Sequence, residues 1–403
     1  MEDQAPLRWK TLFAYPFRAF FFATAVWALL AIPLWIMAYR GFIQLPFALA
    51  PTAWHAHEML FGFFPAALAG FLLTTVCVWT KTERTHGLPL ALLWGLWVLG
   101  RVTMLIGYYI PFGIVVAIQV SFLIGVLYDA AKRILPQRQR RQYPMLVIVL
   151  LLIAMQLGFL LTGGLLAFSK ATLMLALGMM WIIGGRITPA FSRNWLKRQG
   201  REEDAAAIQS PAWVETLTLV SIFTLIGVVA ISAIPAVAYH AAYGPSLAIV
   251  AIAAAALSSY RLWRWRGWTV RNEPLLWVLH LALAWIPVTL VLMALSALEL
   301  APNLIWIHAL SIGAMSALIH GVISRVGLGH TGRPLVLPKG IATAYVLLQI
   351  GALVRLVVEL PVFRNVYLPG LDLSSAFWGA AFLMLLIRYT PMLFRPRVDG
   401  KEG

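Results

Sequence analysis

Long apolar runs recur along the whole chain, and they constrain its fold more than any other feature. A run of about 20 apolar residues is long enough to cross a bilayer as an α-helix. The sequence therefore predicts an all-α membrane protein with twelve transmembrane helices. They are expected at residues 18–39, 56–79, 88–106, 111–131, 144–163, 168–186, 212–232, 244–261, 274–297, 303–324, 340–360 and 372–393.

Composition leaves no room for another kind of domain. The chain is 61% hydrophobic and 11% charged, whereas soluble domains carry about 25% charged residues. The longest polar stretch, residues 193–211, is too short to fold alone. We expect one transmembrane domain over residues 1–403 and no soluble domain. The sequence also lacks a basic start followed at once by a short apolar core, so we expect no cleavable signal peptide.

The basic residues set the expected direction of the helices. Loops on the cytoplasmic side of a membrane carry an excess of Lys and Arg. If the N-terminus lies inside, 26 of the 31 basic residues fall in inner segments. We therefore predict that both termini are cytoplasmic. The net charge of +16 is assigned to topology and to contact with anionic lipid, and not to nucleic acid.

The cysteine and methionine residues give little support for a metal site formed by sulfur ligands. The single cysteine, Cys77, excludes an intramolecular disulfide and a CxxC metal motif. Met174, Met179 and Met180 crowd the sixth predicted helix. Thioethers can bind Cu(I), but we favour adaptable packing as their role.

Five histidines lie within or beside the predicted helices, and they fall into two groups by depth. His55, His57 and His308 belong to the outer group, and His280 and His320 to the inner group. Ionisable residues in such segments mark functional sites by default. Imidazole is a common ligand of haem iron and copper, so these histidines are the candidate haem and metal ligands. A lone histidine at this depth is also explained by an ordinary hydrogen bond.

The helix directions suggest how the histidines pair. His280 and His320 lie on consecutive antiparallel helices, which usually pack together, so we predict that they ligate one haem or metal. His57 and His308 are predicted to approach each other across the second and tenth helices. Residues two apart on a helix point about 200° apart, so His55 should face a separate partner.

Two arginines fall well inside predicted helices, where each needs an anion. Haem propionates would satisfy Arg101 and Arg355 and would make them cofactor-binding residues. Glu58 for Arg101 and Glu359 for Arg355 are equally good protein partners. Glu58 itself fits an interfacial carboxylate, a counter-ion or a proton carrier, and we favour a counter-ion.

Two glycine-containing basic segments and an internal similarity complete the pattern. "GGRITPAF" (184–191) includes Arg186, and "GLGHTGRPL" (327–335) includes His330. Backbone amides there could hold an anion, although a helix stop explains both segments equally well. In the second and tenth helices a histidine precedes a glycine by five residues, which hints at repeated helix groups.

The chain resembles the NnrS family through "FRAFF", "WHAHEMLFG", "GGRITPAFSRNW" and "WIHALSIGAMSALIHGVISRVGLGHTGR". The resemblance covers nearly the whole chain. It implies a twelve-span bacterial inner-membrane protein that contains haem and copper and serves the nitric oxide response and denitrification. Haem–copper oxidases are also similar in architecture, but their adjacent His-His pair and His-x-x-x-Tyr pattern are absent here. The residues that match the family's motifs are His55, His57, Glu58, Arg186, His308, His320 and His330.

Two functions of different classes follow. The first is a haem protein, of b type and with copper as a second metal, that binds nitric oxide or transfers electrons, with an unknown electron donor. Whether it is an enzyme is left open. The second is a proton-coupled secondary transporter, which twelve spans and Gly- or Pro-interrupted helices suit, and in which the histidines and Glu58 relay protons. A third alternative is an assembly factor for a respiratory complex.

Overall fold

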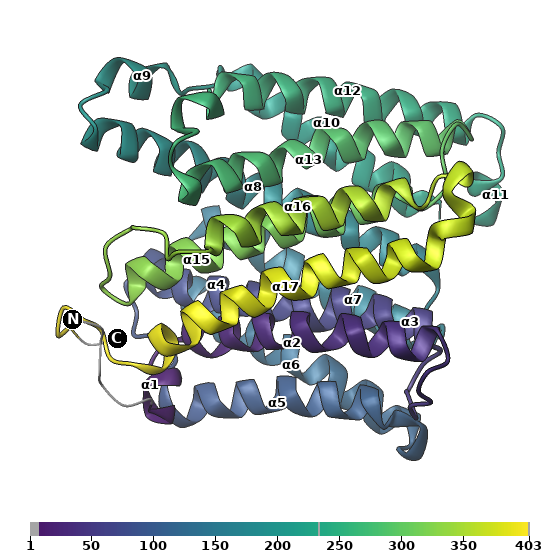
Figure 1. The fold of residues 1–403 in the computed structure, drawn as a ribbon, viewed down its shortest axis with the longest axis horizontal. Coiled ribbons are helices and arrows are strands. Elements are labelled where there is room, and N and C mark those ends of the chain that lie inside the picture. Colours follow the sequence, from purple (N-terminus) through teal and green to yellow (C-terminus); the bar gives the residue numbers. More distant parts are fainter. Residues whose placement is uncertain (1–7, 233, 402–403) are drawn as a thin grey trace. The chain divides into compact units, whose positions relative to one another are not determined.

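The computed structural model describes residues 8–232 and 234–401, in which every regular element is a helix (Figure 1). The α-helices are α1 (Trp9–Leu12), α2 (Pro16–Tyr39), α3 (Pro51–His57), α4 (Phe64–Thr80), α5 (Gly87–Leu105), α6 (Phe112–Ile134), α7 (Tyr143–Leu161), α8 (Leu166–Arg198), α9 (Glu202–Ala207), α10 (Ala212–Ile231), α11 (Pro235–Ala238), α12 (Tyr243–Arg264), α13 (Pro274–Ala297), α14 (Ile305–His308), α15 (Ala317–His330), α16 (Ile341–Val357) and α17 (Tyr367–Phe394). Two π-helices are η1 (Glu58–Phe63) and η5 (Ala309–Ser316), and short 3₁₀ helices are η2 (Gly107–Tyr109), η3 (Arg140–Gln142), η4 (Gly267–Val270) and η6 (Pro361–Val366).

The helices confirm an all-α membrane protein. Within the described residues, eleven helices or continuous helical runs are long and apolar enough to cross a membrane. The eleventh predicted span corresponds to the shorter apolar helix α16, of 17 residues. A count of twelve spans and the cytoplasmic placement of both termini stay predictions.

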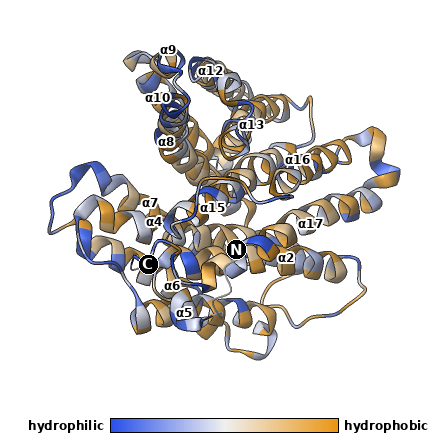
Figure 2. Ribbon diagram, turned by 60° about the vertical axis from the view of Figure 1, so that its left-hand side comes forward, coloured by the Kyte–Doolittle hydropathy of each residue, from blue (hydrophilic) through white to orange (hydrophobic). Residues whose placement is uncertain are grey.

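Apolar side chains cover the helices on their outer faces as well as inside. In Figure 2 hydrophobic residues run along the helices, and hydrophilic residues gather on loops and helix ends. On α7, for example, Val147, Leu150 and Leu161 are exposed although they are large and apolar. A helix that is hydrophobic all round belongs in lipid or in a protein core, so these faces indicate contact with membrane lipid.

The chain folds into two compact units. Unit 1 comprises the described parts of residues 1–172, 323–338 and 382–403, and unit 2 comprises residues 173–322 and 339–381. The helices α8, α15 and α17 each contribute residues to both units. The single domain expected over 1–403 is neither confirmed nor excluded by this division.

From the sequence we expected the glycine-containing segment at residues 184–191 to lie where a helix ends and a loop begins. The structure shows that this expectation is wrong. The segment lies inside α8, which continues to Arg198. A β-carbon on Gly184 would lie 2.9 Å from a methyl group of Leu283, and one on Gly185 would lie 2.4 Å from the Arg261 guanidinium. The two glycines therefore allow α13 and Arg261 to approach closely. The backbone amides of this segment lie inside a helix, where they bond to helix carbonyls and are not available to bind an anion.

The second glycine-containing segment does end a helix. The helix α15 stops at His330, and Gly332 has a φ of +75°, a left-handed conformation that favours glycine. The tail of the chain docks on this turn, because the Val398 amide donates to the Thr331 carbonyl at 3.2 Å. The Arg397 guanidinium donates to the His330 carbonyl at 2.9 Å.

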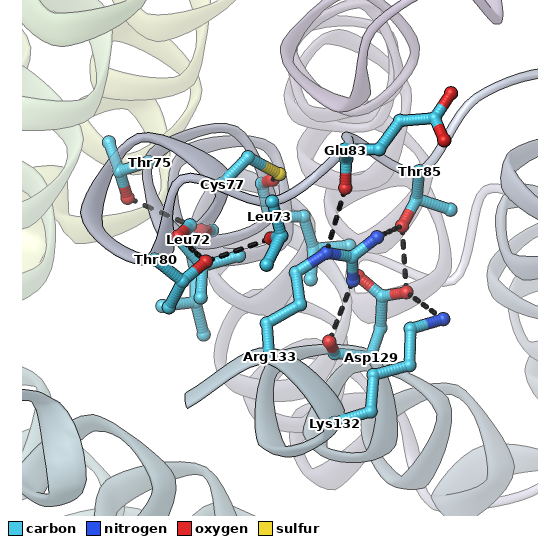
Figure 3. Close-up of polar contacts among 12 residues, drawn as sticks. Leu72, Leu73, Thr75, Cys77, Thr80, Glu83, Thr85, Asp129, Lys132 and Arg133 are labelled. Carbon is cyan, nitrogen blue, oxygen red and sulfur yellow. Dashed lines mark hydrogen bonds and ion pairs between the residues drawn. The ribbon is translucent and has the colours of Figure 1, made fainter. Parts of the chain in front are cut away.

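A polar cluster in unit 1 joins the end of α6 to the loop between α4 and α5 (Figure 3). The Arg133 guanidinium donates to the Glu83 carbonyl (3.1 Å), the Thr85 hydroxyl (2.7 Å) and the Asp129 carboxylate (2.5 Å). Thr85 and Lys132 also bind Asp129. Arg133 and Asp129 are both buried, so their charges are neutralised within the cluster.

Candidate functional site

His57 and Glu58 form a contact in unit 1 that is closed to solvent. The Nδ1 atom of His57 lies 2.9 Å from Oε1 of Glu58, and both side chains have no exposed surface. A carboxylate at one ring nitrogen fixes the proton there and directs the lone pair of the other nitrogen outward. Metal-ligating histidines commonly have this arrangement.

Arg101 of α5 supplies the counter-charge for Glu58. Its Nη1 donates to Oε2 of Glu58 at 2.6 Å, and its Nη2 donates to the Gln119 amide oxygen at 2.7 Å. The Gln119 amide nitrogen in turn donates to the Gly100 carbonyl. A buried carboxylate is costly unless it is paired and hydrogen-bonded, and here both conditions are met. Glu58 thus occupies the counter-ion position favoured from the sequence.

The other side of the His57 ring meets a glutamine and two aromatic rings. Its Nε2 lies 3.4 Å from the Gln156 amide nitrogen, beyond the usual range of a hydrogen bond. Gln156 is fully buried, and its amide oxygen has no hydrogen-bond partner. The ring centroids of Phe61 and Phe159 lie 5.3 Å and 6.0 Å from that of His57. The Gln156 amide and two apolar rings therefore surround this side of the His57 ring.

A π-helix places these groups. Immediately after His57 the chain forms η1, in which the Phe64 amide bonds the Met59 carbonyl five residues back. Proline has no amide hydrogen, so Pro65 cannot make the usual α-helical bond, and the hydrogen-bond ladder is weakest beside it. π-helical segments are rare and are frequent at functional sites.

Gly62 of η1 lets α5 come close. Its carbonyl accepts a 3.0 Å hydrogen bond from the Trp97 indole. A β-carbon on Gly62 would lie 2.2 Å from Nη1 of Arg101. The glycine therefore leaves room for the guanidinium in the position where it binds Glu58.

A second histidine, carboxylate and arginine lie together in unit 2. The Nδ1 atom of His308 lies 3.4 Å from Oε2 of Glu359, and the same oxygen accepts from Arg355 at 2.9 Å. The His308 side chain is 20% exposed and that of Glu359 14%, so this group is less enclosed than the one in unit 1. Both arginines therefore pair with the glutamates that we considered from the sequence as alternatives to propionates.

His280 and His320 contact different neighbours in unit 2. Nε2 of His280 lies 2.9 Å from the Ser192 hydroxyl of α8. Nε2 of His320 lies 3.2 Å from the Ala381 carbonyl, and its ring meets that of Tyr345 edge-on. Their predicted role as ligands of one haem stays a prediction.

His55 and His330 contact aromatic rings of other helices. The His55 ring stacks on Trp35 of α2 at a centroid distance of 4.0 Å, so His55 and His57 face different helices, as their offset along the chain predicts. His330 contacts the Phe17 ring, and Arg186 is an exposed residue of α8. His57 and His308 lie in different units, so their predicted approach also stays a prediction.

Comparison with known protein families matches residues 11–397 to NnrS, described as "NnrS protein". The chain belongs to the NnrS family. No curated protein sequence matches it. Membership of the NnrS family suggests a membrane protein of the nitric oxide response, in agreement with the apolar helices.

The residues present fit a cofactor that needs few protein ligands. Among the described residues, no three of His, Cys, Asp and Glu gather as a metal site. A haem brings its own pyrrole nitrogens and would need few ligands from the protein, and His57 would hold it through its one oriented nitrogen. The unpartnered amide oxygen of Gln156 is a polar atom that a bound group would meet.

Sequence reasoning missed Gln119 and Gln156. Each is a lone amide within an apolar run, "GIVVAIQVSFLIG" and "LLIAMQLGFLL". A polar side chain in such a run normally faces other helices and finds a partner there. Inspection of the amides together with the ionisable residues would have found both.

Proposed function

We propose that this chain is a bacterial inner-membrane haem protein, with copper as a second metal, that binds nitric oxide or transfers electrons in the nitric oxide response and denitrification. The observation that carries the proposal is the buried chain from His57 through Glu58 to Arg101. In this arrangement the proton of the His57 ring lies on Nδ1, facing Glu58, and the lone pair of Nε2 is available to a metal. An ionisable group in an apolar helix is costly, and it therefore marks a functional site by default.

Each residue of the site has a role in this proposal. Glu58 accepts the Nδ1 proton of His57 and keeps the ring in one tautomer and orientation. Arg101 pairs with the Glu58 carboxylate, a buried charge that would be costly without a partner. The Gln156 amide nitrogen lies 3.4 Å from Nε2, so a group bound at Nε2 would displace this amide.

A bound haem iron or copper ion would supply an open coordination position for nitric oxide. The protein supplies access, because a small uncharged gas crosses lipid and needs no polar channel. Phe61 and Phe159 place apolar rings beside the imidazole. Arg101 and Arg355 remain candidates for propionate contacts, which each would share with its glutamate.

The test is a visible spectrum of the purified full-length chain before and after addition of nitric oxide. The proposal predicts a Soret band that shifts with nitric oxide. The shift should be lost in His57→Ala and kept in His240→Ala, which alters an exposed loop histidine. A wild-type chain without a Soret band would instead favour the proton-coupled transporter, for which the same buried His, Glu and Arg would form a proton relay.

A further inference from the structure

The segment "YRLWRWRGWTVR", residues 260–271, carries four arginines and three tryptophans, and the proposed function uses none of them. It covers the end of α12, the short helix η4 and the residue after it. The structure divides its side chains between the interior of unit 2 and the surface of that unit. The arginines of the two groups differ in what they bind.

Two of the arginines are engaged by the protein. Arg261 is buried, and its Nε donates to Oε1 of Glu215 at 2.9 Å. Its guanidinium also lies 4.8 Å from the centroid of the Trp265 ring, which is a cation–π contact. Arg264 donates through Nε to the Gln209 carbonyl at 3.2 Å. Both side chains therefore have partners within unit 2.

The other two arginines, Arg266 and Arg271, are exposed. Within the part of the chain that the structure describes, neither side chain has a hydrogen-bond or ion-pair partner. Arg266 has a φ of +47°, a left-handed conformation that is uncommon outside glycine. The hydroxyl and the amide of Thr269 donate to its carbonyl at 2.8 Å and 2.9 Å, and these bonds hold the turn. Two guanidinium groups are thus available to a ligand outside the chain.

Aromatic rings place these arginines at the membrane surface. Trp263 and Trp268 are exposed. The Tyr260 ring stacks on Trp263 and on Trp213 of α10, at centroid distances of 5.8 Å and 5.9 Å. Tryptophan and tyrosine are enriched where a membrane protein passes from hydrocarbon to water. The end of α12 therefore lies at the level of the lipid headgroups.

An exposed apolar face begins beside these rings. Along α10, Trp213 is followed by Leu217, Val220 and Phe223, which are all exposed. Residues three or four apart lie on one face of a helix, so these side chains form a continuous apolar surface. A lipid acyl chain can lie along such a surface, whereas a free phosphate ion gains nothing from it. The combination favours a phospholipid over an inorganic anion.

The charges around the turn favour a lipid with net negative charge. The helix α9 lies beside the turn, because Arg201 donates to the Thr269 carbonyl at 2.9 Å (Figure 1). Arg201 is itself neutralised by Asp204. The other fully exposed charged side chains of this surface are four cations and two carboxylates, namely Lys197, Arg198, Arg266, Arg271, Glu202 and Glu203.

We propose that Arg266 and Arg271 form a binding site for the headgroup of an anionic phospholipid. Guanidinium groups bind phosphate oxygens in a bidentate manner. Trp263 and Trp268 lie at the depth of the glycerol backbone, and the acyl chains run along the exposed face of α10. The site uses none of the histidines of the proposed function, so its test is independent of haem or copper.

The test is native mass spectrometry of the purified full-length chain titrated with phosphatidylglycerol, which gives the affinity for the first bound lipid. A basic residue at the membrane surface contributes about fivefold to the binding of anionic lipid. The double variant Arg266→Gln/Arg271→Gln should therefore bind about 25-fold more weakly than wild type. If this variant does not show wild-type helicity, Arg271→Gln alone replaces it, with an expected loss of about fivefold.

The matched control is Arg140→Gln/Arg141→Gln, which removes the same charge from exposed residues after α6. It should bind the first phosphatidylglycerol as wild type does. Equal weakening in the two double variants would overturn the inference, because the overall positive charge would then explain binding. Equal affinity of wild type for phosphatidylethanolamine, or displacement of the lipid by equimolar inorganic phosphate, would overturn it as well.

Discussion

At the scale of single residues, Gly62 decides whether Arg101 can reach Glu58. In Gly62→Ala the new methyl group would overlap Nη1 of Arg101, so the guanidinium must shift, and we expect its contact with Glu58 to weaken. Loss of one partner from a buried ion pair costs about 3–5 kcal/mol, and we expect a destabilisation of up to that size in detergent. Thermal unfolding followed by circular dichroism measures it.

The matched control is Gly95→Ala on α5, the helix that carries Arg101. A β-carbon there meets nothing within 4 Å, and alanine favours a helix by about 1 kcal/mol over glycine. Gly95→Ala should therefore be neutral or stabilising. Equal melting temperatures for the two variants would show that the Arg101–Glu58 pair contributes little.

The sequence predicted the ionisable residues of the site but not their arrangement. His57, Glu58, Arg101 and their depth follow from a hydropathy pattern, because charges in apolar runs stand out. Gln156 and the Nδ1 contact of His308 with Glu359 depend on packing between helices distant in the chain. Helix depth indicates which residues share a level, but not which faces meet.

At the scale of secondary-structure elements, Arg133 of α6 holds the loop that follows α4 through hydrogen bonds to Glu83 and Thr85. Arg133→Ala would leave the buried Asp129 without its main counter-charge and free the Glu83 carbonyl. Truncating such a pair costs about 3–5 kcal/mol. We expect faster hydrogen exchange in residues 81–86, measured by mass spectrometry.

The control for this variant is Arg140→Ala, which removes an exposed arginine after α6. Surface substitutions usually change stability by less than about 0.5 kcal/mol. If the rate of hydrogen exchange in residues 81–86 rises equally in both variants, the Arg133 cluster does not stabilise the contact between α6 and this loop.

The tail after α17 depends on pH through Asp399. Hydrogen bonds from Arg397 lower the pKa of Asp399 from 3.8 to about 2. A lowered carboxyl pKa stabilises the docked tail above pH 3.8, and this contribution is lost as the pH falls through about 2. Asp399→Asn should therefore accelerate exchange of the Val398 amide at neutral pH, whereas Lys401→Ala should not. Unchanged exchange in Asp399→Asn would show that the ion pair does not hold the tail.

Helix limits were predictable wherever a turn signal ended an apolar run. They were not predictable at residues 184–191, where two glycines and Pro189 are typical of a helix end but the helix continues. The reason is tertiary, because Leu283 and Arg261 occupy the space beside the glycines. The two π-helices have no simple sequence signal except the proline that follows η1.

At the scale of the whole molecule, the basic residues predict that both termini are cytoplasmic. A fluorescent protein that folds only in the cytoplasm should fluoresce when fused after residue 403, and alkaline phosphatase fused there should be inactive. A fusion of each reporter in the loop near His240 should give the opposite result. Active phosphatase at the C-terminus would contradict an even number of spans with an inner N-terminus.

The central claim is that His57, oriented by Glu58, binds the metal of a cofactor. The most direct measurement is the haem and copper content of the purified full-length chain, by pyridine haemochrome and elemental analysis, in wild type and in Glu58→Gln. We predict at least one haem iron or copper ion per wild-type chain. Glu58→Gln should bind it about 10–100-fold more weakly, as expected for loss of a partner that orients a ligand. A folded wild-type chain that contains neither haem nor copper would contradict the claim.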